Sequence, residues 1–154
     1  MGGGRITGAD TEFAGVSIDT RTLERGQLFL ALRGERFDGH AFLQAAAQKG
    51  AAAAVVERAG ECGLPQVVVR DAQAALTALA GAWRRRCRAL VLGVGGSNGK
   101  TTTKELLASI LGQAGPTLAT RGNLNNHIGV PLTLLRLEPA HRYAVIEMGA
   151  NHPG

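Results

Sequence analysis

The sequence predicts an α/β fold made of two successive units with parallel sheets. Short apolar runs alternate with longer stretches of helical periodicity, and this order favours parallel strands joined by right-handed crossovers. The pattern restarts after a basic run at residues 84–88. We therefore predict a small N-terminal α/β domain over residues 1–86, followed by the first part of a second parallel-sheet domain over residues 87–154.

Four apolar runs and two helical patterns make up the first unit. Gly50 ends a helix predicted over residues 41–49, because glycine commonly follows the last helical turn. Asp71 stands at the N-cap position of an Ala- and Leu-rich helix over residues 72–86. The candidate strands are residues 13–18, 27–32, 52–56 and 66–69.

The second unit opens with a continuous apolar run at residues 89–94, as expected of a strand that is buried on both faces. A Gly-rich turn, a helix with Leu106, Leu107 and Ile110 on one side, a short strand, a short helix that begins at Pro131 and a last strand follow. Their predicted bounds are residues 95–99, 101–111, 117–119, 131–137 and 143–148. These strands are too few to cover a parallel sheet, so we expect a fragment, or a partner that covers exposed apolar surface.

Composition excludes several classes of protein. The 154 residues are 45% hydrophobic but only 4% aromatic, which predicts an aliphatic core. No apolar run approaches the roughly 20 residues of a membrane helix, and the N-terminus lacks a signal-peptide pattern. Cys62 and Cys87 lack metal-binding spacing, so free thiols in a reducing cytoplasm are expected. The net charge of +5 could mark a nucleic-acid partner, but without a nucleic-acid motif we interpret residues 84–88 as a solvated helix end.

Residues 94–102 have the features of a phosphate-binding loop, because they follow an apolar strand and open a helix. Glycines let backbone N–H groups approach phosphate oxygens, and the helix N-terminus adds partial positive charge. Lys100 can bridge the β- and γ-phosphates of ATP, and the Thr101 hydroxyl can hold Mg²⁺. Position 94 is Val where the general G-x-x-x-x-G-K-[ST] pattern has Gly, and a plain Gly-rich turn is the alternative. The predicted nucleotide-binding residues are Gly96, Ser97, Asn98, Gly99, Lys100, Thr101 and Thr102.

Glu147 is the second candidate of this unit. It follows the apolar run at residues 143–146. At the carboxyl end of a parallel strand, its side chain would point into the crevice where ligands of α/β proteins bind. Mg²⁺ coordination is the chemical use of such a carboxylate. An exposed acid at a strand end is the alternative.

Four motifs resemble the Mur ligase family, and one of them is made of two stretches. Residues 96–105 are similar to its phosphate loop, and residues 17–21 and 31–40 resemble its UDP-binding segment. Residues 122–135 and 145–154 look like the loops of the branch that adds a dipeptide. The resemblance spans about residues 15–154, with the motifs in the family's order. One departure is Gly95, where family members usually carry Thr.

The resemblance implies an ATP- and Mg²⁺-dependent ligase of peptidoglycan-precursor synthesis in the cytoplasm. The dipeptide-adding branch joins D-alanyl-D-alanine to UDP-N-acetylmuramoyl-tripeptide through an acyl phosphate, forming a carbon–nitrogen bond. The resemblance also implies that the full-length protein is a monomer and does not insert into a membrane. The family's carbamylated lysine and C-terminal domain have no counterpart here, so this polypeptide alone is not expected to catalyse ligation. The alternatives are a ligase that adds a single amino acid, and a non-catalytic UDP-sugar or ATP-binding module.

The resemblance also assigns roles to individual residues. Lys100 and Glu147 correspond to catalytic residues, and Thr101 and Glu147 to metal ligands. The residues at the uracil and diphosphate pocket are Ser17, Asp19, Thr20, Arg21, Gly34, Arg36, Phe37, Asp38 and His40. The residues that face the muramoyl-peptide and the γ-phosphate are Asn123, Asn125, Asn126 and His127. For Phe37 and His40, a core residue and a helix cap are the alternatives.

Overall fold

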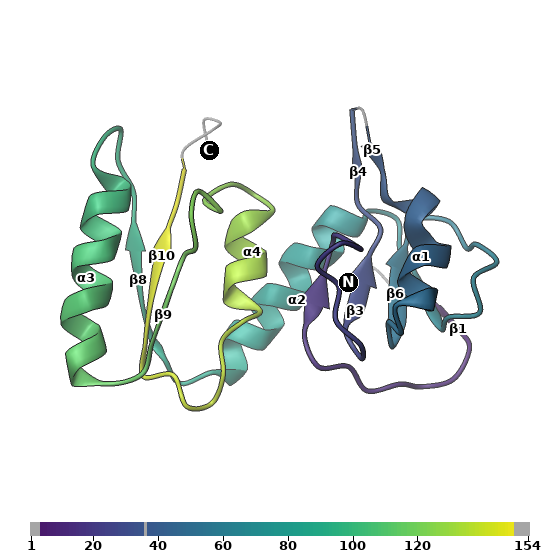
Figure 1. Cartoon of the computed structure of the whole chain (residues 1–154), viewed down its shortest axis with the longest axis horizontal. Helices are drawn as coiled ribbons and strands as arrows, with labels where there is room; N and C mark the ends of the chain where they lie inside the picture. Colours follow the sequence, from purple (N-terminus) through teal and green to yellow (C-terminus); the bar gives the residue numbers. More distant parts are fainter. Residues whose placement is uncertain (1–3, 36, 150–154) are drawn as a thin grey trace. The chain divides into compact units, whose positions relative to one another are not determined.

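The computed structural model describes residues 4–35 and 37–149 of the chain. It confirms the α/β class, with two compact units, Met1–Leu76 and Thr77–Gly154 (Figure 1). The division falls inside helix α2 (Ala72–Arg86) rather than at residue 86, where we placed the boundary. No helix of the described ranges has the length and apolar character that crossing a membrane requires.

The first unit is built on a five-stranded sheet of order β1-β7-β6-β3-β2. All neighbours in it are parallel except the edge pair β1 and β7, which is antiparallel. A hairpin, β4–β5, a 3-10 helix, η1, and helix α1 complete the unit (Figure 1). The strands are β1 Arg5–Thr7, β2 Val16–Ser17, β3 Leu28–Leu30, β4 Arg33–Gly34, β5 Phe37–Asp38, β6 Ala53–Val56 and β7 Gln66–Val68, and the helices are η1 Gly39–Phe42 and α1 Leu43–Gln48.

The core of this unit lies between α1 and the sheet. Leu43 and Ala46 of α1 pack with Phe29 of β3 and with Ala54 and Val56 of β6. Every residue of β3 and β6 is buried, as their continuous apolar runs predict. Strands β1, β4 and β5 were not predicted, and the helix predicted over residues 41–49 is divided between η1 and α1.

The second unit has a three-stranded parallel sheet of order β8-β10-β9. Helices α3 and α4 lie on opposite sides of this sheet (Figure 1). Parallel pairing brings the ends of β8 and β10 together, with Val94 opposite Glu147. The elements are β8 Leu90–Val94, α3 Lys100–Ala114, β9 Thr117–Ala119, α4 Gly129–Leu134 and β10 Tyr143–Glu147.

Two predictions for this unit were wrong. Strand β8 is not buried on both faces: it is an edge strand of the described sheet, and Leu90 is 61% exposed. Helix α4 begins at Gly129, two residues before Pro131, which is tolerated because N–H groups of a first helical turn need no partner within the helix. Leu106 and Ile110 of α3 are exposed, in line with the apolar surface that we expected. Both cysteines are free thiols, as predicted.

Candidate functional site

The phosphate loop connects the end of β8 to the start of α3. Gly96 (φ 139°) and Gly99 (φ 75°) adopt left-handed backbone conformations, which residues with a Cβ atom rarely enter. Gly99 is the N-cap of α3, and no side chain caps this end in the described structure. The first N–H groups of α3 therefore face the loop without a side-chain acceptor, which suits an anion such as a phosphate.

Lys100 folds back over this loop. Its Nζ donates to the carbonyl oxygen of Gly96 at 2.7 Å, and the carbonyl oxygen of Ser97 lies 3.4 Å away. The ammonium group is thereby held above the turn, beside the start of α3. Ser97, Asn98 and Thr102 are exposed. The sequence-predicted phosphate site is thus one continuous structural feature.

Glu147 ends β10 beside the loop and is only 2% exposed, so the alternative of an exposed strand-end acid was wrong. Its Oε2 accepts a hydrogen bond of 3.1 Å from Thr101 Oγ1, and its Oε1 accepts one of 2.8 Å from Asn125 Nδ2. The backbone N–H of Glu147 donates to Thr120 Oγ1 at 2.9 Å. No cation forms an ion pair with this carboxylate within the described residues. A buried carboxylate without a cation is costly, so the site favours a positive ligand.

Mg²⁺ fits the oxygen atoms found here. The carboxylate of Glu147 and the hydroxyl of Thr101 are hard oxygen donors within hydrogen-bond distance of each other. The described chain has no group of three His, Cys, Asp or Glu side chains that could enclose a metal. Mg²⁺ commonly binds through one or two protein oxygens together with phosphates and water. Glu147 and Thr101 would therefore hold the metal jointly with a nucleotide.

The Asn-rich loop after β9 serves two purposes. Asn125 reaches Glu147, and its carbonyl oxygen also accepts the N–H of Gly149 at 2.7 Å. Asn126 Oδ1 accepts the N–H groups of Ile128 and Gly129 at 3.1 and 2.7 Å, which holds the start of α4. The side chains of Asn123 and His127 are exposed at the loop surface. Of these four predicted residues, only Asn125 contacts the carboxylate.

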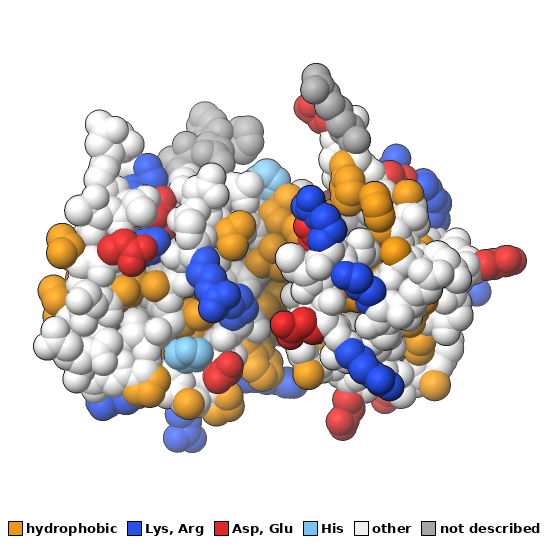
Figure 2. Space-filling view, viewed as in Figure 1, with side chains coloured by type: hydrophobic (Ala, Val, Ile, Leu, Met, Phe, Trp, Pro, Cys, Tyr) orange, Lys and Arg blue, Asp and Glu red, His pale blue; other side chains and the backbone are white. Residues whose placement is uncertain are grey.

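A cavity of about 530 Å³ lies in the first unit, beside the end of β2 and the hairpin β4–β5. Phe37 and Phe42 stack on its wall, with ring centroids 5.3 Å apart and planes 18° from parallel. Figure 2 shows hydrophobic side chains at the surface near the base of this hairpin. The lining residues are Ile18, Asp19, Thr20, Arg21, Phe29, Phe37 and Phe42. An apolar wall with a charged rim suits a planar ring that carries anionic groups.

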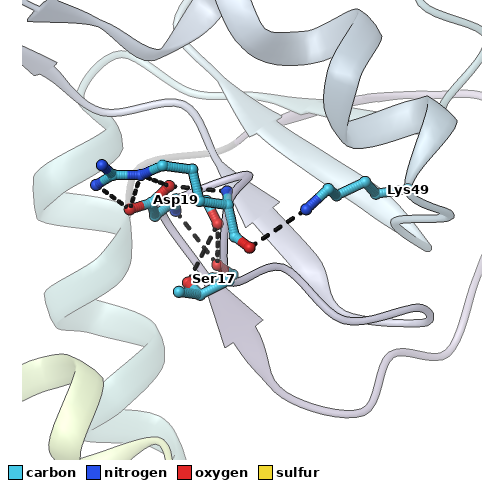
Figure 3. A network of polar contacts seen from close by, with 5 residues as sticks. Ser17, Asp19 and Lys49 are labelled. Carbon is cyan, nitrogen blue, oxygen red and sulfur yellow. Dashed lines mark hydrogen bonds and ion pairs between the residues drawn. The ribbon is translucent and has the colours of Figure 1, made fainter.

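Asp19 and Arg21 form the charged rim of this cavity. Arg21 Nη2 lies 2.7 Å from Asp19 Oδ2, and the Arg21 backbone N–H donates to Asp19 Oδ1 at 2.9 Å. The side-chain hydrogen bond from Arg21, followed by its backbone hydrogen bond, lowers the pKa of Asp19 to about 2. Ser17 Oγ donates to the Asp19 carbonyl at 3.0 Å, and Lys49 Nζ donates to the Arg21 carbonyl at 3.2 Å (Figure 3). These bonds fix the loop, while the Arg21 side chain remains 88% exposed.

Asp38 and His40 belong to the same unit but do not line this cavity. His40 is 5% exposed: its Nδ1 lies 2.7 Å from Asp38 Oδ1, and its Nε2 accepts the N–H of Glu57 at 3.0 Å. Arg58 Nη2 lies 2.6 Å from Asp38 Oδ2. The His40 backbone N–H, then the His40 side chain and Arg58, lower the pKa of Asp38 to about 2. Both residues border a separate cavity of about 250 Å³.

Family models match nearly the whole chain. Residues 12–85 match the model described as "Mur ligase family, catalytic domain", and residues 94–154 match the "Mur ligase middle domain". The chain belongs to the Mur ligase family.

Proteins similar to this Mur ligase chain carry a more specific name. UDP-N-acetylmuramoyl-tripeptide–D-alanyl-D-alanine ligase of Escherichia coli (strain K12) is 52% identical over 98% of the chain and 33% of that protein. The enzyme of the same name from Bacillus subtilis (strain 168) is 44% identical over 94% of the chain and 32% of that protein. The chain spans about a third of the length of these curated relatives.

Solved structures agree with the fold of this Mur ligase chain. A UDP-N-acetylmuramoylalanyl-D-glutamyl-2,6-diaminopimelate–D-alanyl-D-alanyl ligase from Acinetobacter baumannii superposes with a TM-score of 0.86 at 48% identity, covering 92% of the chain and 32% of that structure. MurF ligase from Thermotoga maritima in complex with ADP superposes with a TM-score of 0.80 at 34% identity, covering 91% of the chain and 33% of that structure.

Most of the predicted residues of this Mur ligase chain lie at three places in the structure. The phosphate-loop residues, Glu147 and Asn125 meet at one end of the β8-β10-β9 sheet. Asp19, Thr20, Arg21 and Phe37 line the larger cavity, and Ser17 supports its rim. Asp38 and His40 lie at the smaller cavity, Gly34 is an exposed hairpin residue, and Arg36 lies outside the described residues.

Sequence reasoning missed four residues at these places. Phe29 and Phe42 line the larger cavity, Thr120 accepts the backbone N–H of Glu147, and Lys104 donates to the Thr120 carbonyl. A signal for Lys104 was present, because it follows Lys100 by four positions and so shares its face of the helix. No local pattern marks Thr120 or the two phenylalanines.

Proposed function

We propose that this chain is part of a MurF-type ligase, which joins D-alanyl-D-alanine to UDP-N-acetylmuramoyl-tripeptide with ATP and Mg²⁺ in the cytoplasm. The observation that carries the proposal is the contact of the buried Glu147 carboxylate with the Thr101 hydroxyl, at the start of the phosphate-loop helix. The names of the similar proteins and the ADP of the Thermotoga maritima structure support the same activity.

The phosphate loop has the parts that phosphoryl transfer needs. The first N–H groups of α3 and the Lys100 ammonium bind and orient the β- and γ-phosphates of ATP. Glu147 and Thr101 would hold Mg²⁺, which neutralises charge on the transferring phosphoryl group. In the reaction, the terminal carboxylate of the tripeptide attacks the γ-phosphorus and ADP leaves. The neutral amine of the dipeptide then attacks the acyl carbon, phosphate leaves, the nitrogen loses one proton to water, and an amide bond forms.

The larger cavity of the first unit supplies the proposed site for the UDP group. Phe37 and Phe42 offer a stacked aromatic surface for the uracil ring. Arg21 is exposed at the rim, where its guanidinium can meet the diphosphate. This assignment needs only the first unit, so UDP binding is expected without ATP.

Calorimetric titration of the chain tests both sites. We expect ATP to bind more tightly with Mg²⁺ than without it, and UDP-N-acetylmuramoyl-tripeptide to bind in the absence of ATP. Lys100→Ala should weaken ATP binding about 10- to 100-fold, because a hydrogen bond to a charged group contributes roughly 1.5–3 kcal/mol. Arg86→Ala, which removes an exposed cation in the last turn of α2, is the control. A folded chain that binds neither ligand would contradict the proposal.

A further inference from the structure

Lys104 is a buried cation that the proposed function leaves without a role. It lies on α3, one turn after Lys100, and is 1% exposed. Its Nζ donates to the carbonyl oxygen of Thr120 at 2.8 Å and lies 2.7 Å from Glu105 Oε1. The Glu105 side chain is 66% exposed, so the Thr120 carbonyl is the buried partner of this ammonium. An ammonium at this depth carries a desolvation cost that an apolar side chain would avoid.

Thr120 connects this ammonium to the end of β10. It follows β9 directly and is 2% exposed. Its N–H donates to the Val145 carbonyl at 3.0 Å, and its Oγ1 accepts the N–H of Glu147 at 2.9 Å. With the carbonyl held by Lys104, all three polar groups of Thr120 are engaged. These three hydrogen bonds fix the position of the Thr120 hydroxyl, and the hydroxyl in turn holds the backbone N–H of Glu147.

Helix α3 is therefore connected to Glu147 by two hydrogen-bond routes, one direct and one through Thr120. Thr101 Oγ1 donates a hydrogen bond directly to the Glu147 carboxylate. Lys104 donates to the Thr120 carbonyl, and the Thr120 hydroxyl accepts the backbone N–H of Glu147. Lys104 and Thr101 are three positions apart on the same helix, so both routes depend on the placement of α3 against the strand ends. Groups behind a metal ligand set its orientation and commonly change metal affinity about 10- to 100-fold.

We infer that Lys104 is a positioning residue which, through Thr120, holds the Glu147 carboxylate and the Thr101 hydroxyl in place for the Mg²⁺ of bound nucleotide. The inference rests on the proposed function for the metal. The coupling between Lys104, Thr120 and Glu147 rests on the hydrogen bonds alone.

Two variants interrupt this route at different points. Lys104→Met keeps an unbranched side chain of similar length but removes the donor to Thr120. Thr120→Val keeps the branched shape and removes the acceptor for the Glu147 N–H. Glu105→Gln is the control, because it changes the exposed partner of Lys104 and leaves the bond to Thr120 in place. Melting curves by circular dichroism establish that each variant is folded.

Amide hydrogen exchange is measured first, on the full chain without ligand. We expect exchange of the Glu147 N–H to rise at least about tenfold in both variants, relative to the amides of α3, and to stay unchanged in Glu105→Gln. Titration with ATP follows, with and without Mg²⁺. The gain in affinity from Mg²⁺ should fall about tenfold in both variants while metal-free ATP binding changes less than about twofold. The loss of Mg²⁺-dependent ATP affinity in the double variant should be no larger than in the more severe single variant, because both substitutions interrupt the same hydrogen-bond route.

The outcomes separate this inference from the proposed function. Unchanged Glu147 exchange and unchanged Mg²⁺ dependence in the folded variants would overturn the role of Lys104. If Lys104→Met does not fold, Thr120→Val decides by the same two measurements. If the unmutated chain binds ATP equally with and without Mg²⁺, the proposed metal site and the role of Lys104 toward it both fail, whereas the exchange data still report whether Lys104 and Glu147 are coupled.

Discussion

The Nδ2 amide of Asn125 donates a hydrogen bond of 2.8 Å to Oε1 of Glu147. The N–H of Gly149, two residues after Glu147, donates in the opposite direction to the Asn125 carbonyl at 2.7 Å. Because Thr101 occupies the other carboxylate oxygen, each oxygen of Glu147 has its own donor. The loop after β9 therefore fixes the plane of the carboxylate that we propose as a metal ligand.

Replacing Asn125 by Ala should weaken Mg²⁺-dependent binding of ATP about tenfold, because the carboxylate loses one of its two orienting donors. Titration with ATP in the presence and absence of Mg²⁺ measures the effect. Gln113→Ala is the control, since it removes an exposed amide near the end of α3, the helix whose start forms the phosphate loop. Equal Mg²⁺ dependence in Asn125→Ala and the unmutated chain would show that the amide does not orient Glu147.

The phosphate loop was predictable because its chemistry lies in consecutive residues. Gly96, Gly99, Lys100 and Thr101 carry the turn, the charge and the hydroxyl within six positions, and the flanking strand and helix follow from apolar periodicity. Thr120 was not predictable in this way. It meets Lys104 across 16 positions and Glu147 across 27, so only the packed sheet brings the three together.

Gly129 should not tolerate a side chain. A Cβ atom at this position would lie 2.6 Å from the Leu124 Cα, against backbone that cannot move aside easily. We expect Gly129→Ala to lower the free energy of unfolding by roughly 1–3 kcal/mol, the usual range for overpacking. It should also weaken Mg²⁺-dependent ATP binding, because the close approach of Gly129 to Leu124 sets the position of Asn125.

Gly112→Ala is the control for this substitution. Gly112 lies in α3, and nothing lies within 4 Å of a Cβ atom built there. Alanine in a helix is more favourable than glycine by roughly 0.5–1 kcal/mol, so this variant should gain stability. Denaturant unfolding of the two variants compares them directly, and equal stability of Gly129→Ala and the unmutated chain would contradict the predicted clash.

Stability should depend on pH through Asp38. Hydrogen bonds from His40, together with Arg58, lower the pKa of this carboxyl from an ordinary 3.8 to about 2. A lowered pKa in the folded state stabilises the protein above the ordinary value, and this contribution is lost as the pH falls toward 2. The difference in melting temperature between the unmutated chain and Asp38→Asn should therefore be constant above about pH 5 and shrink between pH 4 and pH 2.

A salt series separates the causes of this shift. The ion pair with Arg58 is exposed and should weaken in about 1 M NaCl, whereas the hydrogen bond from the His40 N–H is less sensitive to screening. Most of the pH-dependent difference should therefore persist in salt. A difference that does not change between pH 5 and pH 2 would contradict the lowered pKa.

The parallel sheets were predictable from continuous apolar runs, but the position of a strand within its sheet was not. The run at β8 is as apolar as that of β6, yet Leu90 is exposed at an edge while all of β6 is buried. Periodicity reports apolar character and does not report which neighbours a strand will have. The hairpin β4–β5 was missed because Arg33–Gly34 and Phe37–Asp38 are too short to show alternation.

The cavity of the first unit supports the last prediction. Phe37 is 48% exposed and stacks on Phe42, so one face of the aromatic pair remains available to the proposed uracil ring. Stacking between a base and an aromatic side chain contributes roughly 1–3 kcal/mol, so Phe37→Ala should weaken UDP binding about tenfold or more.

Phe37→Leu separates stacking of the ring from the loss of apolar surface. Leucine keeps an apolar side chain, so if Phe37→Leu weakens UDP binding as much as Phe37→Ala does, the effect is due to stacking of the ring. Phe13→Ala, which removes an exposed phenylalanine that does not line the cavity, is the control in the same calorimetric titration. UDP affinity that is equal in Phe37→Ala and Phe13→Ala would remove Phe37 from the proposed site, and the uracil ring would then have to be sought against Phe29 and Phe42.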